Sequence, residues 1–309
     1  MNIAVQNLTK TYGYQYAVNN ISFNVNKGEI LGFLGPNGAG KTTTMKMITG
    51  YIGIGTGEIL IGDKSIKDFP DDLKKNIGYL PEHNPLYLDM PVIDYLSFCA
   101  KLQGVTGSKN DERVRKMVKD CGLNAEKHKK IGELSKGYRQ RVGLAQAMIH
   151  DPEILILDEP TTGLDPNQIV EIRQLIKELG KEKTVILSTH ILPEVEATCD
   201  RILIINKGRI VADGTPETLR RQSQGSEIVR VIIEDGAAND ISESLKNLSS
   251  VSSAVLIDAQ NQLFEIHSKE GMSSRREVFY LCKNNNWVIT QMIPVETRLE
   301  DIFRNLTLN

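Results

Sequence analysis

The segment GPNGAGKT, residues 35–42, places the strongest constraint on what this chain can fold into. It follows the apolar run EILGFLG, which predicts a buried strand, and precedes a predicted helix at residues 43–48. The spacing fits the pattern G-x-x-x-x-G-K-[ST]. Its glycines let backbone N–H groups wrap a phosphate, its lysine supplies charge, and its threonine can ligate Mg²⁺. Since a chance match has a probability of about 1 % in a chain of this length, we expect a phosphate-binding loop.

Two further apolar runs end in residues suited to phosphate chemistry. ILILDEP carries Asp158 and Glu159 to the end of one predicted strand, and TVILSTH ends another with His190. Ligands bind at the carboxyl edge of a parallel sheet, so these side chains are expected near the phosphate loop. Asp158 can hold Mg²⁺, and Glu159 can accept a proton from an attacking water. Each feature alone also fits a structural role, because an acidic pair can begin a turn and a histidine can satisfy local hydrogen bonds.

A second small polar loop, LSKGYRQR at residues 134–141, opens another predicted helix. Ser135 is suited to cap that helix, and Gly137 permits close approach of another molecule to the backbone. The N-terminal N–H groups of the helix favour a negative charge. The chain therefore carries one more phosphate-binding loop than a single nucleotide requires.

The order of apolar patterns predicts two domains, at residues 1–220 and 226–309. In the first, strands joined by a crossover helix predict a parallel sheet, preceded by hairpin-like antiparallel strands. Apolar residues spaced three and four apart predict a helical insertion at about residues 84–147. The polar stretch RRQSQGSE, residues 220–227, predicts a linker.

The segment after the linker predicts a small α+β domain. Its order of strand, helix, two strands, helix and strand is the βαββαβ order of ferredoxin-like domains. A last predicted helix, TRLEDIFRNL, places Leu299, Ile302, Phe303 and Leu306 on one face.

The composition narrows the classes of function. A length of 309 residues suggests about two domains. A net charge of −2 without a long basic run disfavours nucleic acid as a partner. The four cysteines form no CxxC pair, which favours buried thiols over a disulfide framework or zinc site. We find no secretory signal and no apolar run near the roughly 20 residues that span a bilayer, so a membrane role is expected to depend on a partner chain.

Together these motifs resemble the nucleotide-binding subunits of ATP-binding cassette (ABC) transporters, over about residues 1–215. The resemblance implies an α/β cassette with a parallel-sheet core, an N-terminal antiparallel β part and a helical subdomain, followed here by the ferredoxin-like domain. The ending LEDIF resembles export-type subunits with a C-terminal extension, including those associated with gliding motility.

The resemblance explains the second loop. In this family the signature loop, here around Ser135 and Gly137, closes over the ATP bound by a partner subunit, so two subunits enclose two ATP molecules. It also implies that Tyr12 stacks on adenine and that Asp165 lies at the dimer seam. The residues expected to bind ATP are Tyr12, Gly35, Pro36, Asn37, Gly38, Ala39, Gly40, Lys41, Thr42, Thr43, Ser135, Gly137 and Asp165.

Two positions depart from the family pattern. Glu82 stands where a glutamine usually contacts Mg²⁺ and links to the membrane subunit, and its charge repels the γ-phosphate unless Mg²⁺ offsets it. Lys136 and Tyr138 replace the commonest glycine and glutamine of the signature loop. The expected Mg²⁺ ligands are therefore Thr42, Glu82 and Asp158.

The predicted function is an Mg²⁺-dependent ATPase that dimerises on ATP, as a homodimer or heterodimer, and drives a separate membrane permease, in the direction of export. Glu159 is the expected general base, and Lys41, Ser135 and His190 the γ-phosphate contacts. The expected location is the cytoplasmic face of the plasma membrane. The alternative is a soluble ABC protein of DNA repair or translation, but the long coiled coil or second cassette of those proteins is missing. A kinase or GTPase leaves LSKGYRQR unexplained.

Overall fold

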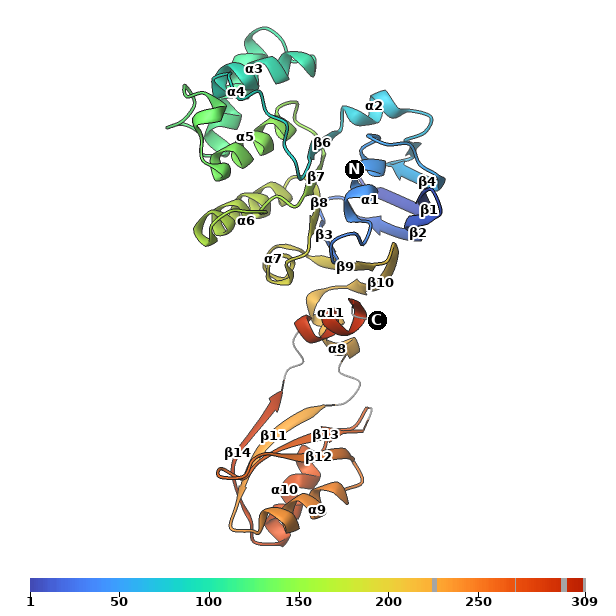
Figure 1. Cartoon of the computed structure of the whole chain (residues 1–309), viewed down its shortest axis with the longest axis vertical. Coiled ribbons are helices and arrows are strands. Elements are labelled where there is room, and N and C mark those ends of the chain that lie inside the picture. The colour runs from blue at the N-terminus through green and yellow to red at the C-terminus, as the bar shows by residue number, and fades with distance from the viewer. Residues whose placement is uncertain (224–226, 270, 296–298, 308–309) are drawn as a thin grey trace. The chain divides into compact units, whose positions relative to one another are not determined.

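The computed structural model describes residues 1–223, 227–269, 271–295 and 299–307, and Figure 1 traces them along the chain. The chain divides into two compact units. The first comprises Met1–Pro216 together with the end of the chain from Leu306, and the second comprises Glu217–Asn305. Each unit has its own apolar core.

A six-stranded sheet forms the centre of the first unit, in the order β10-β9-β3-β8-β7-β6. Every neighbouring pair is parallel except β9 with β10. The strands are β3 (Ile30–Leu34), β6 (Ile77–Leu80), β7 (Ile154–Asp158), β8 (Thr184–Thr189), β9 (Arg201–Asn206) and β10 (Arg209–Gly214). All residues of β3, β7 and β8 are buried, as expected for continuous apolar runs in a parallel sheet covered on both faces. The predicted parallel core is confirmed.

An antiparallel sheet of order β2-β1-β4-β5 shares a core with the parallel sheet. Its strands are β1 (Ile3–Tyr12), β2 (Gln15–Val25), β4 (Thr56–Ile61) and β5 (Lys64–Ser65). The rings of Phe23 and Phe33 join the two sheets, with centroids 5.5 Å apart. Helix α1 (Lys41–Ile48) adds Met45, Met47 and Ile48 to the same core, which fixes the phosphate-loop segment on a rigid base.

Three helices form the predicted insertion: α3 (Val92–Leu102), α4 (Ser108–Asp120) and α5 (Lys136–Met148), with a 3₁₀ turn at Ile131–Glu133. Figure 1 shows them gathered at one end of the first unit, beyond β6 and β7. Tyr95 of α3 donates a hydrogen bond to Gln146 Oε1 of α5 at 2.7 Å, which ties the two helices together. The remaining helices of this unit are α2 (Pro70–Lys74), α6 (Pro166–Gly180) and α7 (Leu192–Thr198).

The second unit contains the predicted βαββαβ order. Its elements are β11 (Ile228–Glu234), α9 (Ala238–Lys246), β12 (Val251–Asp258), β13 (Leu263–Ser268), α10 (Arg275–Asn284) and β14 (Val288–Val295). The strand order is β12-β13-β11-β14, with all neighbours antiparallel. Val231, Phe264 and Ile266 form its core with Ile241 of α9 and Val278 of α10. The ferredoxin-like prediction is confirmed.

The ends of the second unit are helical. The predicted linker at residues 220–227 begins within α8 (Pro216–Ser223), because its Leu219 is buried and supports a short amphipathic helix; residues 224–226 lie outside the described residues. The predicted last helix is α11 (Leu299–Thr307), with Leu299 and Ile302 buried. In the first unit, Asn206 Nδ2 donates to the carbonyl oxygen of Leu306 at 3.0 Å.

The four cysteines are free and buried, as expected for packing residues. Among the helices that the structure describes, none is both long and apolar enough to cross a membrane.

Candidate functional site

Three segments singled out in the sequence emerge at one edge of the parallel sheet. β8 lies between β3 and β7, with Leu34 opposite Thr189 and Asp158 opposite Ser188. Because the strands are parallel, the phosphate loop after β3, the carboxylates at the end of β7 and His190 after β8 leave the sheet on the same side. The sequence alone supplied the residues, and the strand order makes them neighbours.

The phosphate loop needs glycine at particular positions. Gly38 and Gly40 have φ angles of +78° and +108°, in the left-handed region that other residues rarely adopt. A Cβ on Gly40 would lie 2.3 Å from the carbonyl oxygen of Ala17, and one on Gly35 would lie 2.4 Å from that of Ile205. Gly40 also provides no side-chain cap to α1, so the first-turn N–H groups of the helix are left for an anion.

Lys41 lies folded against the loop. Its Nζ donates to the carbonyl oxygens of Gly35 at 2.8 Å and Pro36 at 3.3 Å, and lies 3.4 Å from Glu159 Oε1. The side chains of Lys41 and Glu159 are each 6 % exposed, so this ion pair is nearly shielded from water. A phosphate in the loop would offer Lys41 a second anionic partner.

Glu159 stands between Lys41 and His190. His190 Nδ1 lies 2.9 Å from Glu159 Oε2, and the hydroxyl of Thr162 donates to the same oxygen at 3.3 Å. Glu159 has φ of +50°, and its backbone N–H donates to the carbonyl oxygen of Ser188 at 3.0 Å. The backbone turn thus aims the carboxylate back toward the loop rather than along the strand. His190 is the more exposed partner, with 43 % of its side chain accessible.

Asp158 is completely buried and only half satisfied. Its Oδ1 accepts a hydrogen bond from Ser188 Oγ, whereas Oδ2 is buried with no hydrogen-bond partner among the described residues. Burial raises the pKa of Asp158, the hydroxyls of Ser188 and Thr42 partly oppose this shift, and the negative charges of Glu82 and Glu159 add to it. A cation would satisfy the orphaned oxygen and relieve this repulsion, so the residues present fit Mg²⁺.

The oxygen-bearing side chains near Asp158 suit Mg²⁺ better than a metal ion whose ligands all come from protein side chains. The described residues contain no group of three or more His, Cys, Asp or Glu side chains that could hold a metal ion. Mg²⁺ is commonly held by one or two carboxylates with water and substrate phosphates completing its shell. Thr42 and Glu82 line the same pocket as Glu159, and are available beside Asp158.

These side chains surround a pocket of about 430 Å³ lined by Ala17, Asn37, Gly38, Gly40, Lys41, Thr42, Thr43, Glu82, Glu159, Thr162 and His190. Seven predicted ATP contacts lie outside that lining. Gly35, Pro36 and Ala39 belong to the phosphate loop itself, whereas four lie in other segments: Tyr12, Ser135, Gly137 and Asp165. Tyr12 ends β1 with 56 % of its surface exposed.

Of the other three, two cap their own helices and one packs against a neighbouring helix. Ser135 Oγ accepts from Tyr138 N at 3.4 Å as the N-cap of α5, and Asp165 Oδ1 accepts from Gln168 N at 2.9 Å as the N-cap of α6. Gly137 is buried against Gln168, where a Cβ would come within 2.5 Å of the side chain. Within one chain, Ser135 and Gly137 of the signature loop therefore do not line the pocket formed by that chain's own phosphate loop.

Comparison with known proteins identifies the arrangement. A family model described as "ABC transporter" matches residues 18–162. The chain is 33 % identical to the uncharacterized ABC transporter ATP-binding protein YxlF of Bacillus subtilis over 302 residues, 97 % of this chain and 98 % of the relative. This chain belongs to the ABC transporter ATP-binding proteins. The YxlF match includes the C-terminal unit as well as the cassette.

Other members agree with this assignment. The chain is 35 % identical to Nod factor export ATP-binding protein I of Burkholderia orbicola, over 76 % of this chain and 78 % of the relative. It is similar to a solved dimeric ATP-binding cassette in a post-hydrolysis state with ADP and Pi bound, with a TM-score of 0.64 and 26 % identity over 69 % of this chain and 98 % of that one. The chain is thus an ATP-binding subunit of an ABC transporter and an ATPase.

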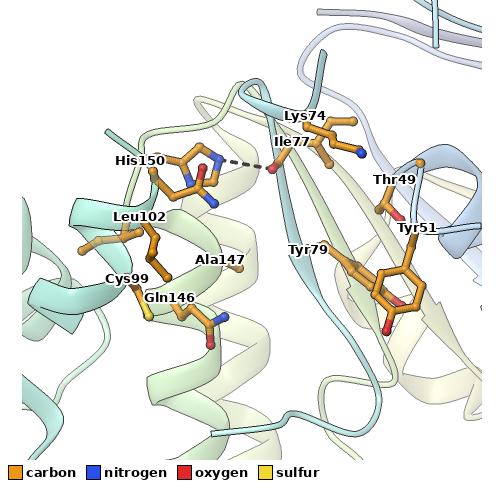
Figure 2. A pocket seen from close by; sticks show the side chains of 13 residues that line it. Thr49, Tyr51, Lys74, Ile77, Tyr79, Cys99, Leu102, Gln146, Ala147 and His150 are labelled. Atoms are coloured by element: carbon orange, nitrogen blue, oxygen red, sulfur yellow. Dashed lines mark hydrogen bonds between the residues drawn. The ribbon is translucent and has the colours of Figure 1, made fainter. Parts of the chain in front are cut away.

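The ABC cassette has a second cavity, of about 470 Å³, between the end of α1, β6 and the helical insertion. Figure 2 shows His150 on one side of it and Tyr51 with Tyr79 on the other. The Tyr79 hydroxyl and His150 Nδ1 are buried with no hydrogen-bond partner among the described residues. Burial raises the pKa of Tyr79 and lowers that of His150, so both are neutral near pH 7. This cavity offers polar groups that a partner could satisfy.

Sequence reasoning missed three residues of the nucleotide site. Ser188 hydrogen-bonds Asp158 and the backbone of Glu159, but a serine within TVILST has no spacing that distinguishes it from an ordinary strand residue. Thr162 and Ala17 line the pocket from segments far from the loop in sequence. Thr162 could have been predicted from the sequence, because a hydroxyl three residues after Glu159, within TTGLDP, can reach the carboxylate of Glu159.

Proposed function

We propose that two copies of this chain, or this chain and a similar subunit, enclose ATP between them and drive a separate membrane permease in the direction of export. The observation that carries the proposal is the division of the predicted site. Lys41, Glu159 and His190 converge on one pocket, whereas Ser135 and Asp165 lie outside it. A complete site therefore requires a second subunit. The dimeric neighbour and the export protein among the relatives support this assembly and direction.

Within the site, we assign the phosphates to Lys41 and the N–H groups of the loop. Thr42, Asp158 and Glu82 are the proposed ligands of Mg²⁺, which would supply positive charge to the phosphate oxygens. Entry of the phosphates gives Lys41 a new anionic partner, so Glu159 loses part of its ion pair and can accept a proton from the attacking water. His190 holds Glu159 through Nδ1 and has its other ring nitrogen for the γ-phosphate.

Tyr12 is proposed to stack on adenine. Its exposed ring ends β1, with Lys10 Nζ 5.8 Å from the ring centroid. The exposure leaves a face of the ring open to a base, as stacking requires.

Replacing Glu159 with Gln tests the catalytic assignment. The change removes the proton acceptor, so kcat should fall by about 10² to 10⁴-fold while ATP still binds. ATP-bound dimer should accumulate, because hydrolysis no longer opens it; size-exclusion chromatography with ATP measures this. The matched control is Glu182→Gln, at an exposed glutamate in the turn after α6, which should behave as wild type. Undiminished turnover in Glu159→Gln would overturn the assignment.

Mixing two defective chains tests the shared site. Chains with Lys41→Ala and chains with Ser135→Ala should each be impaired. In the mixed dimer, one site combines the intact Lys41 of one chain with the intact Ser135 of the other. The equimolar mixture should therefore turn over ATP faster than the mean of the two separate preparations. Turnover equal to that mean would show that each chain uses its own Ser135.

The permease is proposed to dock at the second cavity. The Tyr79 hydroxyl and His150 Nδ1, which lack hydrogen-bond partners in the described part of the chain, are suited to a protein segment that brings its own hydrogen-bonding groups. Tyr79 of β6 lines this cavity, and Glu82, three residues further along the chain, lines the nucleotide pocket. A partner at the cavity is therefore mechanically close to the nucleotide.

A charge at the cavity rim tests this docking. Leu102 lines the cavity with 70 % of its surface exposed, so Leu102→Glu should weaken co-purification with a co-expressed permease and leave the ATPase activity of the isolated chain unchanged. Lys101→Glu, on the same helix but outside the cavity lining, is the matched control. Equal permease recovery with both variants would remove the cavity from the interface.

The remaining assignments follow from this function. We propose a cassette domain at residues 1–220, an accessory domain at residues 226–309, and a location at the cytoplasmic face of the membrane beside the permease. The association with gliding motility stays a prediction. The alternative in DNA repair or translation is not favoured, since the relatives include transport proteins.

A further inference from the structure

A buried glutamate on α7 links two loops at the edge of the nucleotide pocket. Glu194 is 3 % exposed. Its Oε1 accepts a hydrogen bond from Thr161 Oγ1 at 2.6 Å, and its Oε2 accepts one from Thr189 Oγ1 at 2.8 Å. A carboxylate is costly to bury unless hydrogen bonds replace its lost water, so both hydroxyls are held firmly. Each threonine therefore donates to a different carboxylate oxygen of Glu194.

The two threonines lie next to residues that face the nucleotide. Thr189 ends β8 directly before His190, and its Oγ1 also accepts from the backbone N–H of Ile191 at 3.1 Å. The hydroxyl of Thr189 therefore holds the residues before and after His190 in place. Thr161 lies two residues after Glu159, in the segment that leads to α6. Glu194 thus joins the loop after β7 to the loop after β8.

We propose that Glu194 is a positioning residue that couples the segment from Thr161 to Asp165 with the loop that carries His190. The inference rests on the proposed function, because the position of Asp165 at the dimer seam belongs to it. A displacement of the Asp165 segment must either break a buried hydrogen bond of Glu194 or carry the Thr189 loop with it. Closure of the dimer at the seam would then set the position of His190 against Glu159.

This role differs from simple support of the fold. Glu194 and the two threonines that it binds do not line the nucleotide pocket, so ATP affinity should not depend on them. The placement of His190 and Glu159 matters for the chemical step, where small errors in geometry are costly. Loss of the link should therefore lower kcat and leave KM and the Kd for ATP nearly unchanged.

The experiment removes one hydroxyl at a time from the full chain. Thr161→Val and Thr189→Val keep nearly the same volume, and each should lower kcat by about tenfold or more, with the Kd for ATP within about twofold of wild type. The double variant should be no slower than the slower single variant, because losing either end already breaks the link. Glu194→Gln, which retains one acceptor oxygen, should fall between wild type and Glu194→Leu.

The matched control is Thr198→Val on the same helix. Thr198 is 4 % exposed, and its Oγ1 is buried with no hydrogen-bond partner among the described residues, so its removal should leave kcat unchanged. The inference is overturned if Thr161→Val and Thr189→Val have the same kcat as Thr198→Val. It is also overturned if the loss of turnover is fully explained by a loss of ATP binding. Turnover by wild type and its loss in Glu159→Gln report on the proposed function separately. The threonine variants test the coupling through Glu194 even if Glu194→Leu does not fold.

Discussion

The two small polar loops that precede α1 and α5 are both predicted to bind phosphate, but they differ in local chemistry. The N-cap of α1 is Gly40, which makes no side-chain cap, and the loop is bordered by the buried pair Lys41 and Glu159. The N-cap of α5 is Ser135, whose hydroxyl already accepts from the helix. One helix start has no side-chain cap and is bordered by buried charged side chains, while the other is capped by its own serine and lies outside the pocket. Within one chain, the phosphate-binding pattern therefore forms a pocket where strand ends supply its neighbours.

Among the changes that compare the two loops, the largest effect is expected from Lys41→Ala. Removing a charged hydrogen-bond donor to phosphate costs about 1.5 to 3 kcal/mol, which corresponds to roughly 10- to 150-fold in the Kd for ATP. Ser135→Ala should leave the Kd of the isolated subunit within about twofold. Lys46→Ala, in the last turn of the same helix, is the control. Isothermal titration with ATP measures all three, and similar losses from Lys41→Ala and Ser135→Ala would contradict the comparison.

A second test compares two glycines of the open loop. Gly40→Ala and Gly38→Ala both force alanine into a left-handed conformation, at a cost of about 1 to 2 kcal/mol. Only Gly40→Ala also places a methyl group 2.3 Å from the carbonyl oxygen of Ala17, since a Cβ on Gly38 meets nothing within 4 Å. ATP affinity and thermal stability should therefore fall further in Gly40→Ala. Equal losses would mean that backbone strain alone, rather than the close approach of Ala17, requires the glycine.

The smallest effect is expected from Ser135→Ala on stability. Loss of this N-cap should lower the free energy of unfolding by about 1 kcal/mol, as measured by urea denaturation. Ser135→Asp, which can also cap the helix, should retain that stability but repel a partner's γ-phosphate and so lower turnover. The pair separates the capping role of the hydroxyl from its role toward ATP. Full turnover in Ser135→Asp would argue that the loop never approaches phosphate.

Sequence patterns predicted the strands that carry chemistry better than the elements around them. β3, β7 and β8 were predicted because continuous apolar runs end in glycine, acidic or histidine residues. The short helix α7 was not predicted, because LPEVEAT gives little periodicity over seven residues. Its Glu194 is the buried partner of two site loops, a role that only tertiary contact reveals. A lone glutamate in a polar segment gives no sign of burial.

The sequence by itself determined the phosphate loop, the carboxylates Asp158 and Glu159, and the order βαββαβ of the second unit, because local spacing and periodicity encode these features. The tertiary structure decided which residues meet. Only the strand order β3-β8-β7 places His190 2.9 Å from Glu159 and leaves Asp158 Oδ2 buried without a partner among the described residues. The physical reason is that hydrogen bonds and buried charges depend on distances between segments, and a linear pattern does not carry those distances.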